Sequence, residues 1–118
     1  MPSEYQVLLF LENFIVKLGI WGFILRTNRI NDKNTPTLLA LQLDYTQVKE
    51  ILKELKLEDY SDGPLPDTQY NISDMWIFGK MIKEKEVYIK IQLGRPGSEA
   101  ICISFHFPEY KMKYPFKK

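Results

Sequence analysis

The 118-residue chain is long enough for one packed domain, which we expect to span residues 1–118, and too short for two. Its 16 Lys and Arg residues against 15 Asp and Glu residues give a net charge of +1, which excludes the strong overall positive field of many nucleic-acid-binding proteins. Any contact with nucleic acid has to come from local clusters of cations. No stretch reaches the roughly 18 apolar residues of a membrane span, so we expect no membrane contact. The lack of a signal-peptide pattern and the single Cys102 predict a reducing, cytoplasmic location.

The N-terminal segment has the periodicity of an amphipathic helix. Apolar residues recur at helical spacing over residues 4–19, Ser3 is a candidate N-cap, and Gly19 is expected to end the helix. Residues 20–26 form a β-branched and aromatic run that suits either a strand or a second buried segment. The sequence leaves these two alternatives open.

Polar residues then lead to a second helix and a second connection. Residues 26–36 are rich in Asn and Asp, which predicts a loop, and that loop is locally basic. Residues 45–55 predict a helix with Asp44 as its N-cap, because apolar positions gather on one side and charged positions on the other. Residues 59–74 combine prolines, a glycine and several aspartates, which predicts a turn-rich acidic connection.

From residue 75 onward the pattern changes to strands. Alternating apolar and polar residues over 75–82, 86–93 and 100–107 predict a three-stranded antiparallel meander, with 20–26 as a candidate additional strand. We therefore predict an α+β fold in which N-terminal helices pack on a C-terminal antiparallel sheet.

Period-two alternation sorts the side chains of this sheet into an apolar face and a polar face. A register that keeps the apolar residues of the last two strands together also brings their polar residues together. The polar neighbours predicted in this way are Tyr88, Lys90, Ser104 and His106. A tight connection over residues 83–85 adds Lys80 beside Tyr88, with Trp76 and Phe78 on the same side.

These residue types match the needs of metal-independent RNA cleavage, which are a proton acceptor, a proton donor and positive charge near the phosphate. His106, the only histidine, is the first candidate for proton transfer. Lys80 and Lys90 can stabilise phosphate charge, and Tyr88 can donate a hydrogen bond to a phosphate oxygen or to the leaving group. Trp76 and Tyr88 can stack a base of single-stranded RNA.

Cations outside the sheet are candidates for contact with an RNA backbone. These are Arg26, Arg29 and Lys33 in the basic loop and Lys113 in the C-terminal segment. The plainer interpretation is that a polar sheet face is solvated and that a basic tail only increases solubility. Cys102 is expected to pack and not to react. The aspartates of residues 59–74 match no calcium loop, so we expect no metal and no cofactor.

Four stretches between residues 43 and 107, and the segment that follows them, carry a resemblance. They read LDYTQVKEILKELKLEDY, MWIFGK, EVYIKIQL and ICISF, and residues 104–115 read SFHFPEYKMKYP. This pattern resembles the MqsR family of toxins from bacterial type II toxin–antitoxin systems, within the RelE/HigB-like mRNA interferases. The resemblance implies a RelE-like fold, cleavage of mRNA, and a cognate antitoxin that is typically a zinc-ribbon and helix-turn-helix repressor.

The family's function carries over to individual residues. Tyr88 and Lys90 match the VY-(I/L)-K strand of the family, in which the tyrosine is one of the proposed catalytic residues. The family's lysine and glutamine are not kept at their aligned positions, Asp62 and the neighbourhood of Ile77.

The loss of those two groups leaves Lys80 and His106 as candidate replacements. Two hypotheses follow. The chain is a metal-independent endoribonuclease, the toxin of its pair, or it is a non-catalytic module that binds protein or nucleic acid on the same scaffold.

Overall fold

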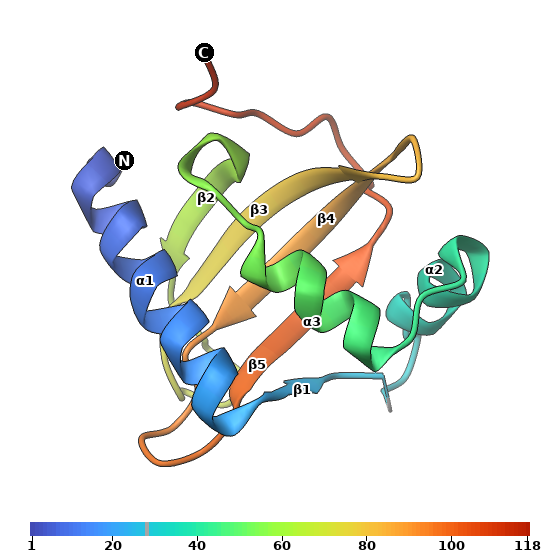
Figure 1. The fold of residues 1–118 in the computed structure, drawn as a ribbon, viewed down its shortest axis with the longest axis horizontal. Coiled ribbons are helices and arrows are strands. Elements are labelled where there is room, and N and C mark those ends of the chain that lie inside the picture. Colours follow the sequence, from blue (N-terminus) through green and yellow to red (C-terminus); the bar gives the residue numbers. More distant parts are fainter. Residues whose placement is uncertain (28) are drawn as a thin grey trace.

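The structure, a computed structural model, describes residues 1–27 and 29–118. Within these residues the chain forms three α-helices, one 3₁₀ turn and a five-stranded mixed sheet, which confirms the predicted α+β fold (Figure 1). In chain order the elements are α1 (Glu4–Trp21), β1 (Phe23–Leu25), α2 (Asn34–Leu41), α3 (Tyr45–Lys53), the 3₁₀ turn (Leu57–Asp59), β2 (Tyr60–Leu65), β3 (Met75–Ile82), β4 (Lys85–Gln92) and β5 (Ala100–His106).

The strands lie in the order β1-β5-β4-β3-β2 across the sheet. β3, β4 and β5 form the predicted antiparallel meander, and β2 extends it at one edge. β1 pairs with β5 in parallel at the other edge, so residues 20–26 do contain a strand. Helices α1 and α3 cover one side of the sheet, which we call the helix face (Figure 1). The opposite side is the outer face.

Helix α1 begins as predicted and ends later than predicted. The Ser3 hydroxyl accepts from the Gln6 backbone N–H, and the Gln6 side chain accepts from the Ser3 N–H, a capping box. The expected end at Gly19 is wrong, because the helix continues to Trp21. Gly22 ends it, with φ of 74° and its N–H bonded to the Leu18 carbonyl.

The two predicted connections are shorter than expected. Helix α2 begins at Asn34, inside the predicted loop 26–36, and the Asn34 side chain is buried against β5. Strand β2 occupies the start of the predicted connection 59–74, because Tyr60 is buried edge-on against the ring of Phe78. As an edge strand with interrupted pairing, β2 tolerates the glycine and proline that suggested a turn. Helix α3 begins at Tyr45 with Asp44 as its N-cap, as predicted, and ends at Lys53, two residues before the predicted end at residue 55.

The turn between β3 and β4 decides which side chains share a face. It contains only Lys83 and Glu84, both with positive φ (50° and 69°), as in a type I′ hairpin. Lys80 therefore pairs with Val87, one position away from the expected partner Tyr88. Because a shift of one residue moves every side chain to the other face, the prediction that placed Lys80, Trp76 and Phe78 beside Tyr88 is wrong.

A β-bulge interrupts the pairing of β4 with β5. Lys90 pairs with Ser104 and Ile91 pairs with Cys102, which leaves Ile103 without a partner in the register. On one side of the bulge, Tyr88 lies opposite His106, so the four predicted polar neighbours are together on the outer face. Beyond the bulge the faces differ from the prediction, because Cys102 turns to the core.

The core lies between the helix face and the two helices. The ring of Phe10 in α1 stacks on Trp76, with ring centroids 4.7 Å apart, and also on Phe78 at 6.2 Å. Val48 and Leu52 of α3 are fully buried in the same core. None of the helices in the described part of the chain combines the length and apolarity needed to cross a membrane.

Candidate functional site

A cleft of about 540 Å³ opens on the outer face of the sheet. Strands β3, β4 and β5 supply its floor, and the edge strand β2 and the C-terminal segment after β5 supply its walls. The floor residues are Ile77, Tyr88, Lys90, Ser104 and His106, and the wall residues include Asp62, Glu109 and Lys113. The cleft thus lies on the side of the sheet that α1 and α3 leave uncovered.

Tyr88 and His106 form an aromatic pair on the cleft floor. They are directly opposite each other on β4 and β5, with ring centroids 5.0 Å apart and ring planes 16° from parallel. His106 Nδ1 lies 2.9 Å from the carbonyl oxygen of Phe107. Because a carbonyl oxygen only accepts, this contact places the proton on Nδ1 and leaves Nε2 free to take a proton.

The phenol of Tyr88 is held in its protonated form. Burial raises the pKa of Tyr88 above its ordinary value, and the nearby carboxylates of Asp62 and Glu109 raise it further. At neutral pH this group donates a hydrogen bond or a proton and does not act as a base. The pair therefore combines a proton acceptor at His106 Nε2 with a proton donor at the Tyr88 hydroxyl.

Lys90 brings positive charge to the same floor. It is half-buried beside Ser104, its direct partner on β5. Burial lowers the pKa of Lys90, the guanidinium of Arg29 lowers it further, and Asp67 acts in the opposite direction. Arg29 Nη2 donates to the carbonyl of Ile103, at the bulge of β5, over 2.8 Å. The bulge thus anchors an arginine close to the half-buried lysine.

A second hollow adjoins the cleft and carries more cations. Its lining includes Arg29 and Lys33 from the basic loop together with Ser104 and His106 from the sheet. Ser104 and His106 line both hollows. The basic loop therefore lies next to the cleft, on the β5 side of the outer face. Arg29 and Lys33 thus add two cations beside the floor that holds Lys90.

The C-terminal segment crosses the end of the outer face, running from β5 towards β2 (Figure 1). Lys33 Nζ binds the Glu109 carboxylate at 2.6 Å, and the Tyr114 hydroxyl donates to Glu86 at 2.5 Å. Tyr114 lies on Gly79, where an added Cβ would be 2.2 Å from its hydroxyl oxygen. Phe116 packs on Tyr60 with centroids 5.4 Å apart.

No family model, curated protein or solved structure matches this chain. The function therefore has to be inferred from the site itself.

The structure brings together most of the predicted site residues. Tyr88, Lys90 and His106 share the cleft floor, Lys113 lies in its wall, and Arg29 and Lys33 line the adjoining hollow. The remaining three predicted residues, Lys80, Trp76 and Arg26, line neither hollow.

These three residues have structural partners elsewhere. Lys80 lies on the helix face and binds Asp59 at 3.3 Å, and its ammonium also reaches the Glu54 carbonyl. Trp76 packs in the core on Phe10. The guanidinium of Arg26 lies over the ring of Tyr70, 4.5 Å from its centroid.

Two acidic wall residues, Asp62 and Glu109, were not predicted to face the site. Asp62 belongs to β2, whose glycine and proline made its sequence look like a turn. Glu109 lies beyond β5, where no periodic pattern predicts the direction of a side chain. Burial raises the pKa of the Cys102 thiol to about 12, so this cysteine packs in the core as expected. Within residues 1–27 and 29–118, no group of three or more His, Cys, Asp or Glu residues is placed to hold a metal ion.

Proposed function

We propose that this chain is an endoribonuclease that cleaves mRNA without a metal, the cytoplasmic toxin of a type II toxin–antitoxin pair. The observation that carries the proposal is the convergence of a free histidine nitrogen, a protonated phenol and a half-buried lysine on one cleft floor. The resemblance of residues 43–107 to MqsR toxins supports the toxin assignment. It also suggests a cognate antitoxin, of the zinc-ribbon and helix-turn-helix type, as the inhibitor.

In the proposed reaction the RNA supplies its own nucleophile. His106 Nε2 takes the proton of the 2′-hydroxyl, the 2′-oxygen attacks phosphorus, and the bond to the 5′-oxygen breaks as the Tyr88 hydroxyl protonates it. Lys90 and Arg29 stabilise the charge on the non-bridging phosphate oxygens. The products are a 2′,3′-cyclic phosphate and a 5′-hydroxyl. Return of a proton from His106 to Tyr88 through solvent restores both groups.

The deciding experiment is induced expression in a bacterial host, with growth and mRNA integrity measured for the native chain, Tyr88→Phe and His106→Ala. Tyr88→Phe keeps the ring that stacks on His106 and removes only the hydroxyl. We expect growth arrest and mRNA loss with the native chain, and a loss of cleavage of at least about 100-fold in both variants. The matched control is Tyr70→Phe, which removes an exposed hydroxyl away from the cleft and retains activity.

Two results contradict the proposal in different ways. Arrest and mRNA loss in both site variants would show that cleavage uses another site. Normal growth with intact mRNA for the native chain would reject the nuclease.

The second result favours the alternative, a non-catalytic binding module on the same scaffold. The specific observation in its favour is the pair of carboxylates, Asp62 and Glu109, in the cleft wall. Carboxylates repel phosphate and attract basic groups, so a basic peptide of a protein partner fits that wall better than RNA does. Capture of such a peptide by the native chain, together with intact RNA, would establish this alternative.

A further inference from the structure

The outer face carries two hollows that meet at the aromatic pair. One is the cleft, which extends from His106 and Tyr88 to Ile77 of β3 and Asp62 of β2. The other, which we call the loop hollow, has a volume of about 500 Å³. Its lining combines the basic loop with β5 and includes Arg29, Asn31, Lys33 and Ser104. His106 lines both hollows, so the pair lies at the boundary between them.

The order of the strands gives this pair a direction across the sheet. His106 is on β5 and Tyr88 is on β4, and β3 and β2 follow beyond Tyr88. The basic loop lies on the other side of the pair, because it begins at Arg26, directly after β1, and the Arg26 N–H donates to the Cys102 carbonyl of β5. A path from the basic loop to β2 therefore passes His106 before Tyr88.

The proposed cleavage has a direction too, because its two reacting oxygens belong to different nucleotides. The 2′-hydroxyl belongs to the nucleotide on the 5′ side of the scissile phosphate, and the leaving 5′-oxygen belongs to the nucleotide on the 3′ side. These two oxygens lie on opposite sides of phosphorus during an in-line displacement. A proton acceptor and a proton donor within reach of them therefore mark where each nucleotide lies.

We propose that a bound RNA crosses the outer face in one direction, with its 5′ part in the loop hollow and its 3′ part in the cleft towards β2. This direction rests on the proposed nuclease, in which His106 takes the proton of the 2′-hydroxyl and Tyr88 protonates the 5′-oxygen. With ring centroids 5.0 Å apart, the two side chains are close enough to flank one phosphate group. The opposite direction would put the 2′-hydroxyl beside a phenol that donates a proton and does not accept one.

Each part of the RNA then has its own cation. Lys33 lines the loop hollow, and Lys113 is an exposed residue in the cleft wall. The residue after Lys113, Tyr114, contacts Gly79, which is the partner of Tyr88 on β3. Lys113 therefore lies on the β3 side of Tyr88. We expect Lys33 to bind a phosphate 5′ of the cut and Lys113 to bind a phosphate 3′ of it.

The Lys33 ammonium already has an anionic partner, the Glu109 carboxylate at 2.6 Å. Because Lys33 lines the loop hollow and Glu109 lines the cleft, this ion pair lies where the RNA passes from one to the other. The two side chains are 52% and 54% exposed, and an ion pair this exposed is weak enough for a phosphate to replace the carboxylate. Glu109 thus competes with the 5′ part of the RNA.

The test compares short substrates with extended ones. The preferred cut is first found by sequencing the fragments of a long RNA. Substrates are then made with one ribonucleotide at the cut and 2′-O-methyl nucleotides elsewhere, and are extended on the 5′ side or on the 3′ side. For each extension, the gain is the ratio of kcat/KM for the extended substrate to kcat/KM for the short one. The effect of a variant on the reacting groups cancels in this ratio.

We expect Lys33→Ala to lower the 5′ gain about threefold at low salt and to leave the 3′ gain unchanged, and we expect Lys113→Ala to do the reverse. Glu109→Gln should raise the 5′ gain, because Lys33 loses the carboxylate that competes with phosphate. Lys53→Ala is the matched control, since Lys53 is an exposed lysine on α3 and its substitution changes neither gain. Circular dichroism verifies that all the variants are folded.

The outcomes separate this proposal from the nuclease on which it rests. If Lys33→Ala lowered the 3′ gain and Lys113→Ala lowered the 5′ gain, the RNA would run in the opposite direction and the nuclease would stand. Equal effects of both variants on both gains would also overturn the proposed direction. A long RNA that stays intact would instead reject the nuclease, and the direction with it.

Discussion

In the proposed nuclease, Lys90 combines a binding role with a cost in stability. Its ammonium is half-buried on the cleft floor, where burial and the guanidinium of Arg29 lower its pKa and the carboxylate of Asp67 acts in the opposite direction. A half-buried ammonium weakens a fold because burial disfavours its charged form, and sites that bind anions commonly keep such groups. We therefore expect that replacing the Lys90 ammonium with an apolar group increases stability and decreases activity.

We predict that Lys90→Met raises the free energy of unfolding by up to about 1 kcal/mol while it reduces RNA cleavage. The folded-state pKa of Lys90 is lowered below its ordinary value of 10.5, so the folded chain binds this proton less tightly than the unfolded chain does. The penalty is fully present below the folded pKa and disappears as the pH rises towards 10.5. Urea unfolding should show the gain of Lys90→Met at neutral pH and its decline in alkaline buffer. A variant less stable than the native chain at neutral pH contradicts this account.

At the scale of elements, the buried side chain of Asn34 continues the hydrogen bonding of β5 where strand β1 ends. β1 pairs with β5 only as far as Leu25, and beyond it the side chain of Asn34 takes over. Its Nδ2 donates to the carbonyls of Arg26 (2.6 Å) and Ile103 (3.1 Å), and its Oδ1 accepts from the Phe105 N–H (2.8 Å). Asn34 thus holds the start of α2 and the base of the basic loop against β5, close to His106.

The C-terminal segment depends on a glycine in β3. We predict that Gly79→Ala displaces Tyr114, because the added Cβ would lie 2.2 Å from its hydroxyl oxygen and 2.9 Å from Cε of Met112. The measurement is the rate of trypsin cleavage at Lys111 and Lys113, which should rise, with a loss of stability of about 1–2 kcal/mol.

Tyr114→Phe separates the steric part of this contact from the hydrogen bond to Glu86. The phenylalanine ring can remain on Gly79, so the cleavage rate should lie between those of the native chain and Gly79→Ala. An unchanged rate in Gly79→Ala would show that the segment is held without this contact.

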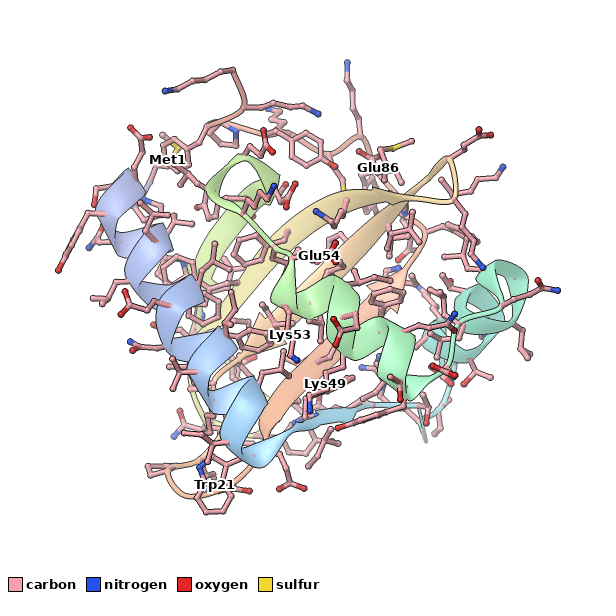
Figure 2. All side chains as sticks on the ribbon, viewed as in Figure 1. Met1, Trp21, Lys49, Lys53, Glu54 and Glu86 are labelled. Carbon is pink, nitrogen blue, oxygen red and sulfur yellow. The ribbon has the colours of Figure 1, made fainter. Side chains whose placement is uncertain are left out.

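At the scale of the whole molecule, a net charge of +1 conceals an uneven distribution. Lys90, Lys113, Arg29 and Lys33 line the outer face, whereas the lysines of α3 lie on the helix side of the sheet (Figure 2). Of the outer-face cations, Lys33 is neutralised by Glu109. Binding of RNA should consequently depend on single outer-face cations and not on the total charge.

We predict that Lys113→Ala weakens binding of a single-stranded RNA with 2′-O-methyl groups, which cannot be cleaved, by about threefold at low salt. The slope of log K against log salt should fall by about 0.7, the value for one lost phosphate contact on a single strand. Lys53→Ala is the matched control, because Lys53 is an exposed lysine on α3 and should change neither quantity. Equal losses in both variants would indicate attraction by net charge alone.

Sequence patterns were enough to predict the α+β class, the N-caps of α1 and α3, and the gathering of Tyr88, Lys90, Ser104 and His106 on one face of the sheet. These features depend on local chemistry, such as the Ser3 and Asp44 caps, and on alternation along two strands with strong apolar faces.

The faces of Lys80 and Trp76, the existence of β2 and the position of Glu109 depend on tertiary contacts. A two-residue turn and a three-residue connection differ by one position in register, and the sequence KEK is compatible with both. Likewise, β2 exists because Tyr60 finds a buried place against Phe78 and Phe116, although its local sequence favours a turn. Registers and edge strands are fixed by contacts between residues distant in the chain, which composition and periodicity do not contain.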